Sequence, residues 1–269
     1  MPLDDVRDDA AGAGRAVARA LTNAAPGTVV APDAVTDEDI ALIHQGLEQA
    51  WAAGREVVVR CAAPLAARCA AALSPGLLPT PLTRPPGPVL VVCGSHTSGA
   101  TAQLAALERE HGIRPVVLAT PAALADPATA GSELVARARD QLRRHGVAVL
   151  AGERQRRAQD NTLDHGERVM TALMAAVREL SGEVAAVIAK GGITSAETAR
   201  TGLGSAAARV RGQLLAGISV WDLTRLDGAE PVPYVVVPGN VGDEGTLVEA
   251  VRRLGVEAAS CTAGRPSAL

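Results

Sequence analysis

Three short segments are rich in glycine, and the first two also carry hydroxyl side chains, a composition typical of anion binding. They lie at residues 94–101, 190–195 and 238–244, and each follows an apolar run that resembles a buried strand. Glycine lets the backbone approach an anion closely, and N–H groups at the start of a following helix point toward that anion. Each segment taken alone could equally be a strand-to-helix turn. Three such strand ends in one sheet favour a nucleotide site.

The second of these segments contains an unusual basic residue, Lys190. The chain has 26 basic residues, and Lys190 is the single lysine among them. An ammonium is a compact point charge, whereas a guanidinium is a planar fork, so a tight phosphate corner can demand lysine. Lys190 is therefore predicted to stabilise phosphate charge. The alternative is a lysine that snorkels from a strand end.

The elements that would position these segments alternate along the chain. Continuous apolar runs predict strands at 89–93, 116–118, 147–150 and 184–189, and helical patterns separate them. This alternation predicts an α/β fold of three layers, with a mostly parallel sheet flanked by helices. Shorter segments at 208–210, 218–221 and 234–237 predict a mixed or antiparallel extension near the C-terminus.

The distribution of prolines and the lengths of the apolar and helical segments predict four parts of the chain. Residues 1–73 form a short α/β segment, with strands expected at 28–31 and 57–59. Residues 74–88 hold six of the 17 prolines and form a linker or surface crossing. Residues 89–257 form the nucleotide-binding α/β domain, and residues 258–269 a disordered tail.

Composition and missing motifs exclude several classes of protein. With 1% aromatic residues and a net charge of −3, the chain lacks the stacking platforms and basic excess of a nucleic-acid binder. No P-loop motif, HExxH motif or paired-cysteine spacing occurs, so no metal site held by protein ligands alone is expected. There is neither a signal segment nor a run of about 20 apolar residues, so no membrane partner is expected and the chain is interpreted as cytoplasmic.

The three segments together resemble a known family. In order along the chain stand Gly94-Ser95-His96, Ala189-Lys190-Gly191-Gly192-Ile193-Thr194-Ser195, Gly212-Gln213-Leu214 and Tyr234-Val235-Val236-Val237-Pro238-Gly239-Asn240-Val241-Gly242. They are similar to the nucleotide-binding, C-terminal domain of the four-carbon acid sugar kinases. Members of that family phosphorylate small acids such as erythronate, threonate or 3-oxo-tetronate with ATP. The resemblance implies bound ATP, with Mg²⁺ arriving on the nucleotide.

The resemblance and the loop chemistry together give a set of candidate nucleotide-binding residues, whereas the catalytic residues stay unknown. The candidates are Ser95, His96, Lys190, Gly191, Gly192, Ile193, Thr194, Ser195, Gly239, Asn240, Val241 and Gly242.

The chain also departs from the family at its start. Members carry an acid-binding domain with an Asp-Asp-x-Thr-Gly motif, whereas Asp4-Asp5 is followed here by Val6-Arg7. The opening residues resemble the end of that first domain. We therefore expect a separate chain to supply the acid site, in a homo- or hetero-oligomer. The alternatives are a non-catalytic nucleotide-binding or regulatory module, a redirected ATP-using enzyme, or a fragment of a longer protein.

Overall fold

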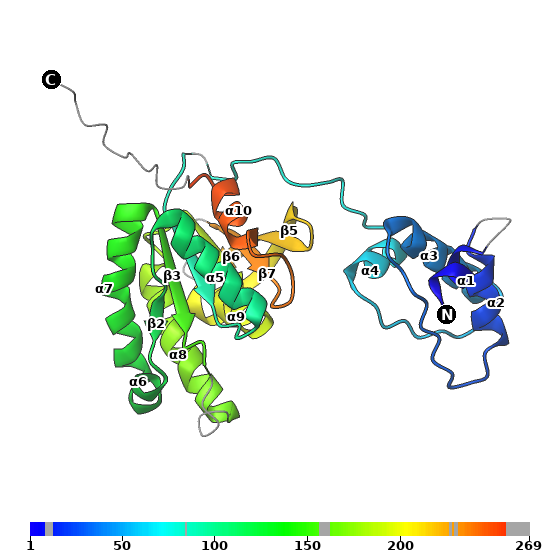
Figure 1. Ribbon diagram of the computed structural model, residues 1–269, viewed down its shortest axis with the longest axis horizontal. Helices are drawn as coiled ribbons and strands as arrows, with labels where there is room; N and C mark the ends of the chain where they lie inside the picture. Colours follow the sequence, from blue (N-terminus) through cyan, green and yellow to red (C-terminus); the bar gives the residue numbers. More distant parts are fainter. Residues whose placement is uncertain (9–12, 84, 156–161, 226–227, 229–230, 257–269) are drawn as a thin grey trace. The chain divides into compact units, whose positions relative to one another are not determined.

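The computed structural model describes residues 1–8, 13–83, 85–155, 162–225, 228 and 231–256. The chain divides into two compact units, Met1–Pro75 and Gly76–Leu269 (Figure 1). The tail predicted to be disordered at 258–269 lies outside the described residues. Among the residues that are described, no helix is long and apolar enough to cross a bilayer.

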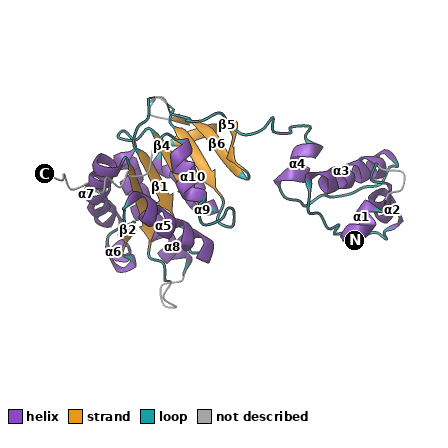
Figure 2. Cartoon of the chain, turned by 45° about the horizontal axis from the view of Figure 1, so that its top comes forward, coloured by secondary structure: helices purple, strands orange, loops and turns teal. Residues whose placement is uncertain are grey.

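The second unit is built on a seven-stranded sheet in the order β2-β3-β1-β4-β7-β6-β5. Figure 2 draws the strands of this sheet in orange. The strands are β1 Val89–Cys93, β2 Val116–Leu118, β3 Val147–Gly152, β4 Ala186–Lys190, β5 Ser205–Leu215, β6 Ile218–Arg225 and β7 Pro233–Val237. The first five strands in that order pair in parallel, whereas β6 pairs antiparallel with both β5 and β7. The predicted mostly parallel α/β sheet with a mixed end is confirmed.

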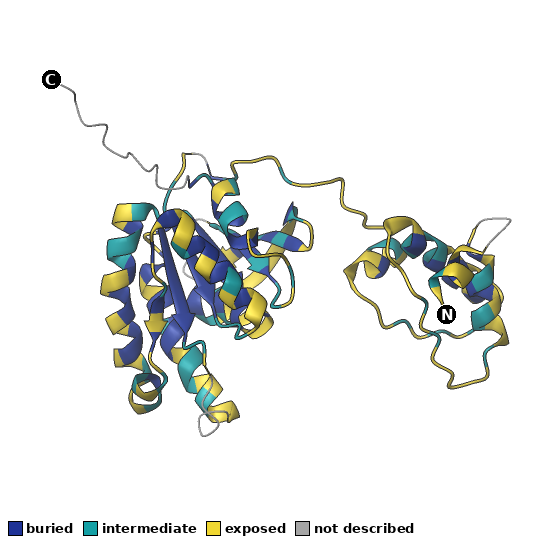
Figure 3. Cartoon of the chain, in the orientation of Figure 1, coloured by how far each residue is buried: buried dark blue, intermediate teal, exposed yellow. Residues whose placement is uncertain are grey.

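Helices cover both faces of this sheet. They are α5 Ser98–His111, α6 Thr120–Ala125, α7 Pro127–His145, α8 Leu163–Leu180, α9 Gly192–Glu197, which continues into a π-helical turn at Thr198–Gly202, and α10 Thr246–Arg253. Leu90 and Val92 of β1 join one hydrophobic core with α7 and α8, whereas Val89 and Val91 join another with α5 and α10. Because successive side chains of a strand point to opposite faces, a wholly apolar strand fills two cores at once (Figure 3).

Helix boundaries around the sheet follow ordinary capping chemistry. The Thr97 hydroxyl accepts a hydrogen bond from the Ala100 N–H at the start of α5, and Gly112 ends that helix with φ 65°. Asp126 accepts from the N–H groups of Ala128 and Thr129 at the start of α7. These caps satisfy backbone donors that a helix N-terminus leaves unpaired. The Thr97 cap fixes where the loop after β1 ends and α5 begins.

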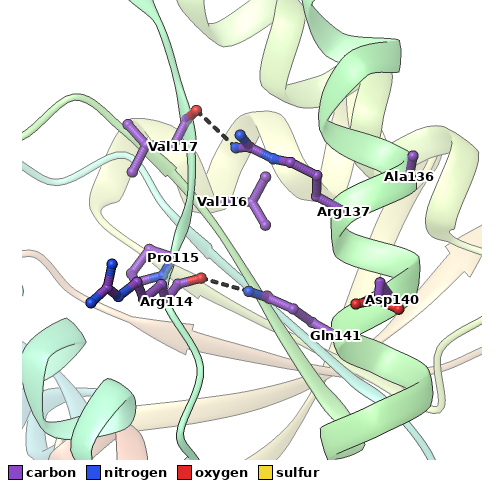
Figure 4. A pocket seen from close by; sticks show the side chains of 8 residues that line it. All are labelled: Arg114, Pro115, Val116, Val117, Ala136, Arg137, Asp140 and Gln141. Carbon is purple, nitrogen blue, oxygen red and sulfur yellow. Dashed lines mark hydrogen bonds between the residues drawn. The ribbon is translucent and has the colours of Figure 1, made fainter.

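The strand β2 forms one edge of the sheet, and side chains of α7 cover it. Arg137 donates to the carbonyl of Val117 and Gln141 donates to the carbonyl of Arg114 (Figure 4). A hollow of about 610 Å³ lies between these residues. The side chains occupy carbonyls to which another strand could bind, so we interpret this hollow as edge protection.

The proline-rich stretch predicted as a linker or surface crossing contacts the second unit. The Leu78 N–H donates to the Gln213 carbonyl of β5 at 2.8 Å, and the Leu82 N–H donates to the Arg253 carbonyl at 3.0 Å. Thr83 is 7% exposed and its hydroxyl donates to the Leu254 carbonyl. The two backbone hydrogen bonds and the buried Thr83 side chain make this stretch part of the surface of the second unit.

The first unit is helical. Its helices are α1 Leu3–Arg7, α2 Arg15–Asn23, α3 Asp37–Ala52 and α4 Ala63–Cys69. They enclose a small core of five buried residues, Val6, Val17, Ile43, Leu47 and Leu65. Thr36 and Asp39 form a capping box at the start of α3, and Asp39 also pairs with Arg7 at 2.7 Å. The pairing stabilises the contact between α1 and α3.

The strands predicted at 28–31 and 57–59 are not formed. In the described residues of the first unit, helices connected by loops are the regular secondary structure. Val29 is 89% exposed and Val58 is 100% exposed. The runs were predicted as strands from their apolar, β-branched composition. A strand needs a hydrogen-bonded neighbour, and an isolated pair is at best marginally stable in water. These two runs find no such neighbour in the described residues of their unit.

Candidate functional site

The carboxyl ends of four adjacent strands lie level along one edge of the sheet. Cys93 at the end of β1 stands opposite Ala151 of β3 and Lys190 of β4, and Lys190 stands opposite Val237 of β7. The loops after β1, β4 and β7 therefore leave the sheet as neighbours. These loops are the three glycine-rich segments of the sequence, at the edge where open α/β sheets bind ligands.

Glycines of all three loops meet around Ser95. A Cβ atom at Gly191 would lie 3.3 Å from the Ser95 Cβ, and a Cβ atom at Gly239 would lie 3.5 Å from the Ser95 Oγ. A Cβ atom at Gly94 would overlap the Thr194 hydroxyl. Gly191 also has φ 116°, a conformation that side chains rarely adopt. The structure thus brings Ser95, Gly191, Thr194 and Gly239 together.

Hydrogen bonds join the first loop to the third across the end of β4. The Thr97 hydroxyl donates to the Gly239 carbonyl at 3.2 Å and lies 3.2 Å from the Ser95 hydroxyl. The buried Gln103 amide donates to the carbonyls of Val241 at 3.3 Å and Asp243 at 2.8 Å. The third loop therefore turns several carbonyls toward the protein, and its position is fixed from α5.

Lys190 is buried beneath the third loop. Its side chain is 1% exposed, and its Nζ donates to the carbonyls of Pro238 at 2.8 Å and Val241 at 3.0 Å. Burial lowers the pKa of Lys190. An ammonium has three N–H donors, and two are engaged here. The geometry is that of a residue that positions the loop, and the predicted stabilisation of phosphate charge by Lys190 stays a prediction.

The turn after β4 divides into buried anchors and an exposed tip. The Ser195 hydroxyl donates to the Gly191 carbonyl at 2.7 Å, and the Tyr234 hydroxyl donates to the Ser195 carbonyl at 2.6 Å. Burial raises the pKa of Tyr234, so this phenol stays protonated and donates. Gly192 and Ile193 are exposed, Ile193 to 76%. A ligand at this turn would reach these two residues first.

The remaining candidates lie along the same edge. His96 is half-buried, and its imidazole lies 3.9 Å from the position of a Cβ atom at Gly152 of β3. Asn240 is exposed at the tip of the third loop. Gly242 has φ 90°, and a Cβ atom there would overlap the side chain of Thr246, which begins α10. Asn240 is therefore accessible to a ligand, whereas Gly242 shapes the turn.

Arg154 is a residue of this edge that the sequence did not single out. It follows β3, and its Nε and Nη2 donate to the Thr101 hydroxyl of α5 at 3.2 and 3.0 Å. It also lies near the Cys93 thiol, whose pKa burial raises while the positive charge of Arg154 opposes that shift. In the sequence Arg154 opens an arginine-rich run, which is more often a solvated surface. The signal that distinguishes it is its position directly after an apolar strand.

The donors at this edge suit an anion. They are hydroxyls, backbone N–H groups beside glycine and one guanidinium. Within the described residues, no group of three or more His, Cys, Asp or Glu side chains could hold a metal ion. Donors of this kind suit phosphate oxygens, and the predicted contacts of these residues with a nucleotide stay a prediction.

Comparisons with known proteins agree with this arrangement. The model of a family described as the nucleotide-binding C-terminal domain matches residues 90–247, more than half of the chain. A search of curated proteins found no match.

Two solved structures share the fold. One is a domain of unknown function (DUF1537) from Bordetella bronchiseptica, a domain-swapped dimer with bound citrate, at 22% identity and TM-score 0.50 over 94% of this chain. The other is a putative tRNA synthase from Salmonella typhimurium LT2, at 15% identity and TM-score 0.56 over 81% of this chain. The matches span 59% and 51% of those two proteins.

The match begins in β1 and ends at the second residue of α10, so it includes all three loops that meet around Ser95. It confirms the resemblance to the nucleotide-binding domain of the four-carbon acid sugar kinases. The chain belongs to the family of nucleotide-binding C-terminal domains.

Proposed function

We propose that this chain is the ATP-binding part of a kinase that transfers the γ-phosphate to a small hydroxy acid of the four-carbon acid sugar class. A separate chain would supply the acid site. The observation that carries the proposal is the convergence of three glycine-rich loops around Ser95 at the carboxyl edge of the sheet. Phosphoryl transfer depends mainly on positioning and on charge stabilisation, and such loops provide the positioning.

In this proposal the exposed tip formed by Gly192, Ile193 and Asn240 contacts the nucleotide directly. The half-buried Ser95 offers a hydroxyl group beside it, whereas Thr194 is buried against Gly94. Lys190 acts indirectly, because its ammonium donates to two carbonyls of the loop that carries Asn240. Mg²⁺ would arrive with ATP and shield its phosphate charge, and phosphates and water would supply most of its ligands.

Calorimetry with Mg–ATP tests the site. Gly192→Val places a branched side chain in space that the protein leaves open, so we expect it to block the nucleotide without disturbing the fold. Gly182→Val is the matched control, because a Cβ atom there also meets nothing within 4 Å and the residue precedes β4 at the opposite edge. Equal ATP affinity in the two variants would remove Gly192 from the site.

A second candidate function is a nucleotide-binding module without kinase activity. It is favoured by the burial of Lys190, which leaves the tip of the turn without a lysine charge. The two functions separate when four-carbon acids are added with and without a chain that carries the Asp-Asp-x-Thr-Gly motif. Phosphorylated acid in the mixture supports the kinase, and ATP binding without turnover in every mixture supports the module.

We also infer that the chain assembles with itself or with the acid-binding chain. The Bordetella bronchiseptica relative is a domain-swapped dimer, which motivates this inference. Light scattering on the purified chain, alone and with the second chain, measures the assembly directly.

A further inference from the structure

Arg154 is a cationic group of the proposed site with hydrogen-bonding capacity left over. Of its guanidinium nitrogens, Nε and Nη2 bond to the Thr101 hydroxyl at 3.2 and 3.0 Å. Within the described part of the chain, the third nitrogen, Nη1, is shielded from solvent and has no hydrogen-bond partner. A buried charged donor without a partner is costly, and native structures rarely keep one without a function. The vacant donor therefore points to a ligand.

The neighbours of Arg154 hold its side chain at the sheet edge. Thr101 lies in α5, and its own hydroxyl donates to the Thr97 carbonyl at 3.2 Å. Thr97 in turn bonds the Gly239 carbonyl of the third loop. A continuous set of hydrogen bonds thus runs from Arg154 through the first loop to the third. Arg154 is positioned by the same residues that assemble the loops around Ser95.

Among the described residues, no carboxylate pairs with Arg154. The Cys93 thiol beside Arg154 is buried, and that burial raises its pKa. The other cation of this edge, Lys190, is engaged with two carbonyls. Lys190 has a third donor, but it is buried beneath the third loop and its other two bonds hold that loop, so Arg154 is the better placed of these two cations to bind an anion. A planar guanidinium with one edge anchored can offer the other to phosphate oxygens.

We propose that Arg154 binds the terminal phosphate of the nucleotide, with Nη1 donating to a phosphate oxygen and Thr101 holding the guanidinium in place. Across the edge, Arg154 follows β3, whereas the three glycine-rich loops follow β1, β4 and β7. Arg154 thus stands at one end of this row of loops, where the end of an extended polyphosphate would lie. This inference rests on the proposed nucleotide site and assigns the charge that Lys190 does not supply.

The test compares Mg–ATP with AMP as calorimetric probes of the full chain. We expect Arg154→Gln to weaken Mg–ATP binding by about 10- to 100-fold, the value of a hydrogen bond to a charged group. AMP affinity should change less than about twofold, because AMP lacks the terminal phosphate. Arg154→Lys should recover part of the loss. Arg143→Gln on the exposed face of α7 is the control arginine and should leave both affinities unchanged.

A second variant tests positioning without removing the charge. Thr101→Val deletes the hydroxyl that holds Arg154, at an exposed position where the fold tolerates the change. We expect a smaller loss for Mg–ATP and none for AMP. This variant also tests whether Arg154 binds the terminal phosphate in the case that the Arg154→Gln variant does not fold.

Failure of this inference is distinct from failure of the proposed function. If the wild-type chain binds Mg–ATP and both Arg154→Gln and Thr101→Val bind it equally well, Arg154 is not a phosphate ligand, and the nucleotide site stands. If the wild-type chain binds no nucleotide, the proposed function falls, and pyrophosphate becomes the probe. Pyrophosphate affinity that Arg154→Gln does not reduce would then overturn the role of Arg154 as well.

Discussion

Two valine-rich runs of this chain have similar composition and different structures. Residues 57–59 in the first unit stay outside any strand, and Val58 is 100% exposed. Val89–Cys93 in the second unit forms β1, and all five of its residues are buried. β1 pairs with strands on both sides, whereas residues 57–59 have no partner strand among the described residues. Local composition favours an extended backbone, and neighbouring strands decide whether a sheet forms.

The two units also hold together in different ways. The second unit has two large apolar cores, one on each face of its sheet. The first unit has one cluster of five buried residues and depends more on polar contacts, such as the pair between Arg7 and Asp39. A small core stabilises weakly, because the area it buries is small relative to the chain it must order. Stability of the first unit should therefore respond to pH more than that of the second.

The largest predicted effect is on the free energy of unfolding, and it compares buried Ile188 in β4 with exposed Val58. Ile188 lies in the centre of β4 and is fully buried, so Ile188→Ala should lower the free energy of unfolding of the second unit by about 2–5 kcal/mol. Val58→Ala in the first unit should change stability by less than about 0.5 kcal/mol. Urea denaturation measures both. A cost for Val58→Ala as large as that for Ile188→Ala would mean that the Val58 side chain packs against something in solution, as Val57 and Val59 pack against the core of the first unit.

A smaller predicted effect is the loss of stability of the first unit at acidic pH. Asp39 is 2% exposed, and its hydrogen bonds to Arg7 and to backbone N–H groups before α3 lower its pKa. The unfolded state then binds more protons than the folded state below about pH 4, so this stabilisation is complete above that pH and is lost as the pH falls. We expect the first unit to melt several degrees lower at pH 3 than at pH 6.

Asp39→Asn is the control for this titration. It removes the charge, so the melting temperature of the first unit should be lower at pH 6 and should change little between pH 6 and pH 3. Circular dichroism across this range tests the effect. An unchanged acid dependence in the variant would assign the titration to another group.

The smallest predicted effect lies in the second unit. Glu249 in α10 pairs with Arg252 and Arg253, which lower its pKa to about 2. Each pair is partly exposed, so Glu249→Gln should cost about 0.3–0.5 kcal/mol per pair at neutral pH. The stabilisation should be present above about pH 4.5 and fade as the pH falls toward 2. A loss comparable to that of Ile188→Ala would show that α10 depends on these pairs rather than on its apolar face.

The sequence predicted the second unit well because its signals are local. Continuous apolar runs identified β1 and the neighbouring strands, and glycine marked the loops that follow them. The failed strands of the first unit depend on pairing, which no local pattern records. Arg154 was missed because an arginine in an arginine-rich run looks like a solvated residue. The position of Lys190 was identified, but its hydrogen bonds to a loop some 50 residues later in the chain depend on the fold.

The burial of Lys190 also makes the chain a convenient reporter of its own motion. Reagents that acylate amines can modify only the α-amino group and Lys190, because the chain has no other lysine. The ε-amine is 1% exposed and lies under residues 238–241, so it is protected while that loop is closed. Each opening of the loop would expose the Lys190 amine, and the α-amino group is the other amine that could react. The rate at which the acyl group appears on Lys190, followed by mass spectrometry of the peptide that contains it, would therefore report how often the loop opens.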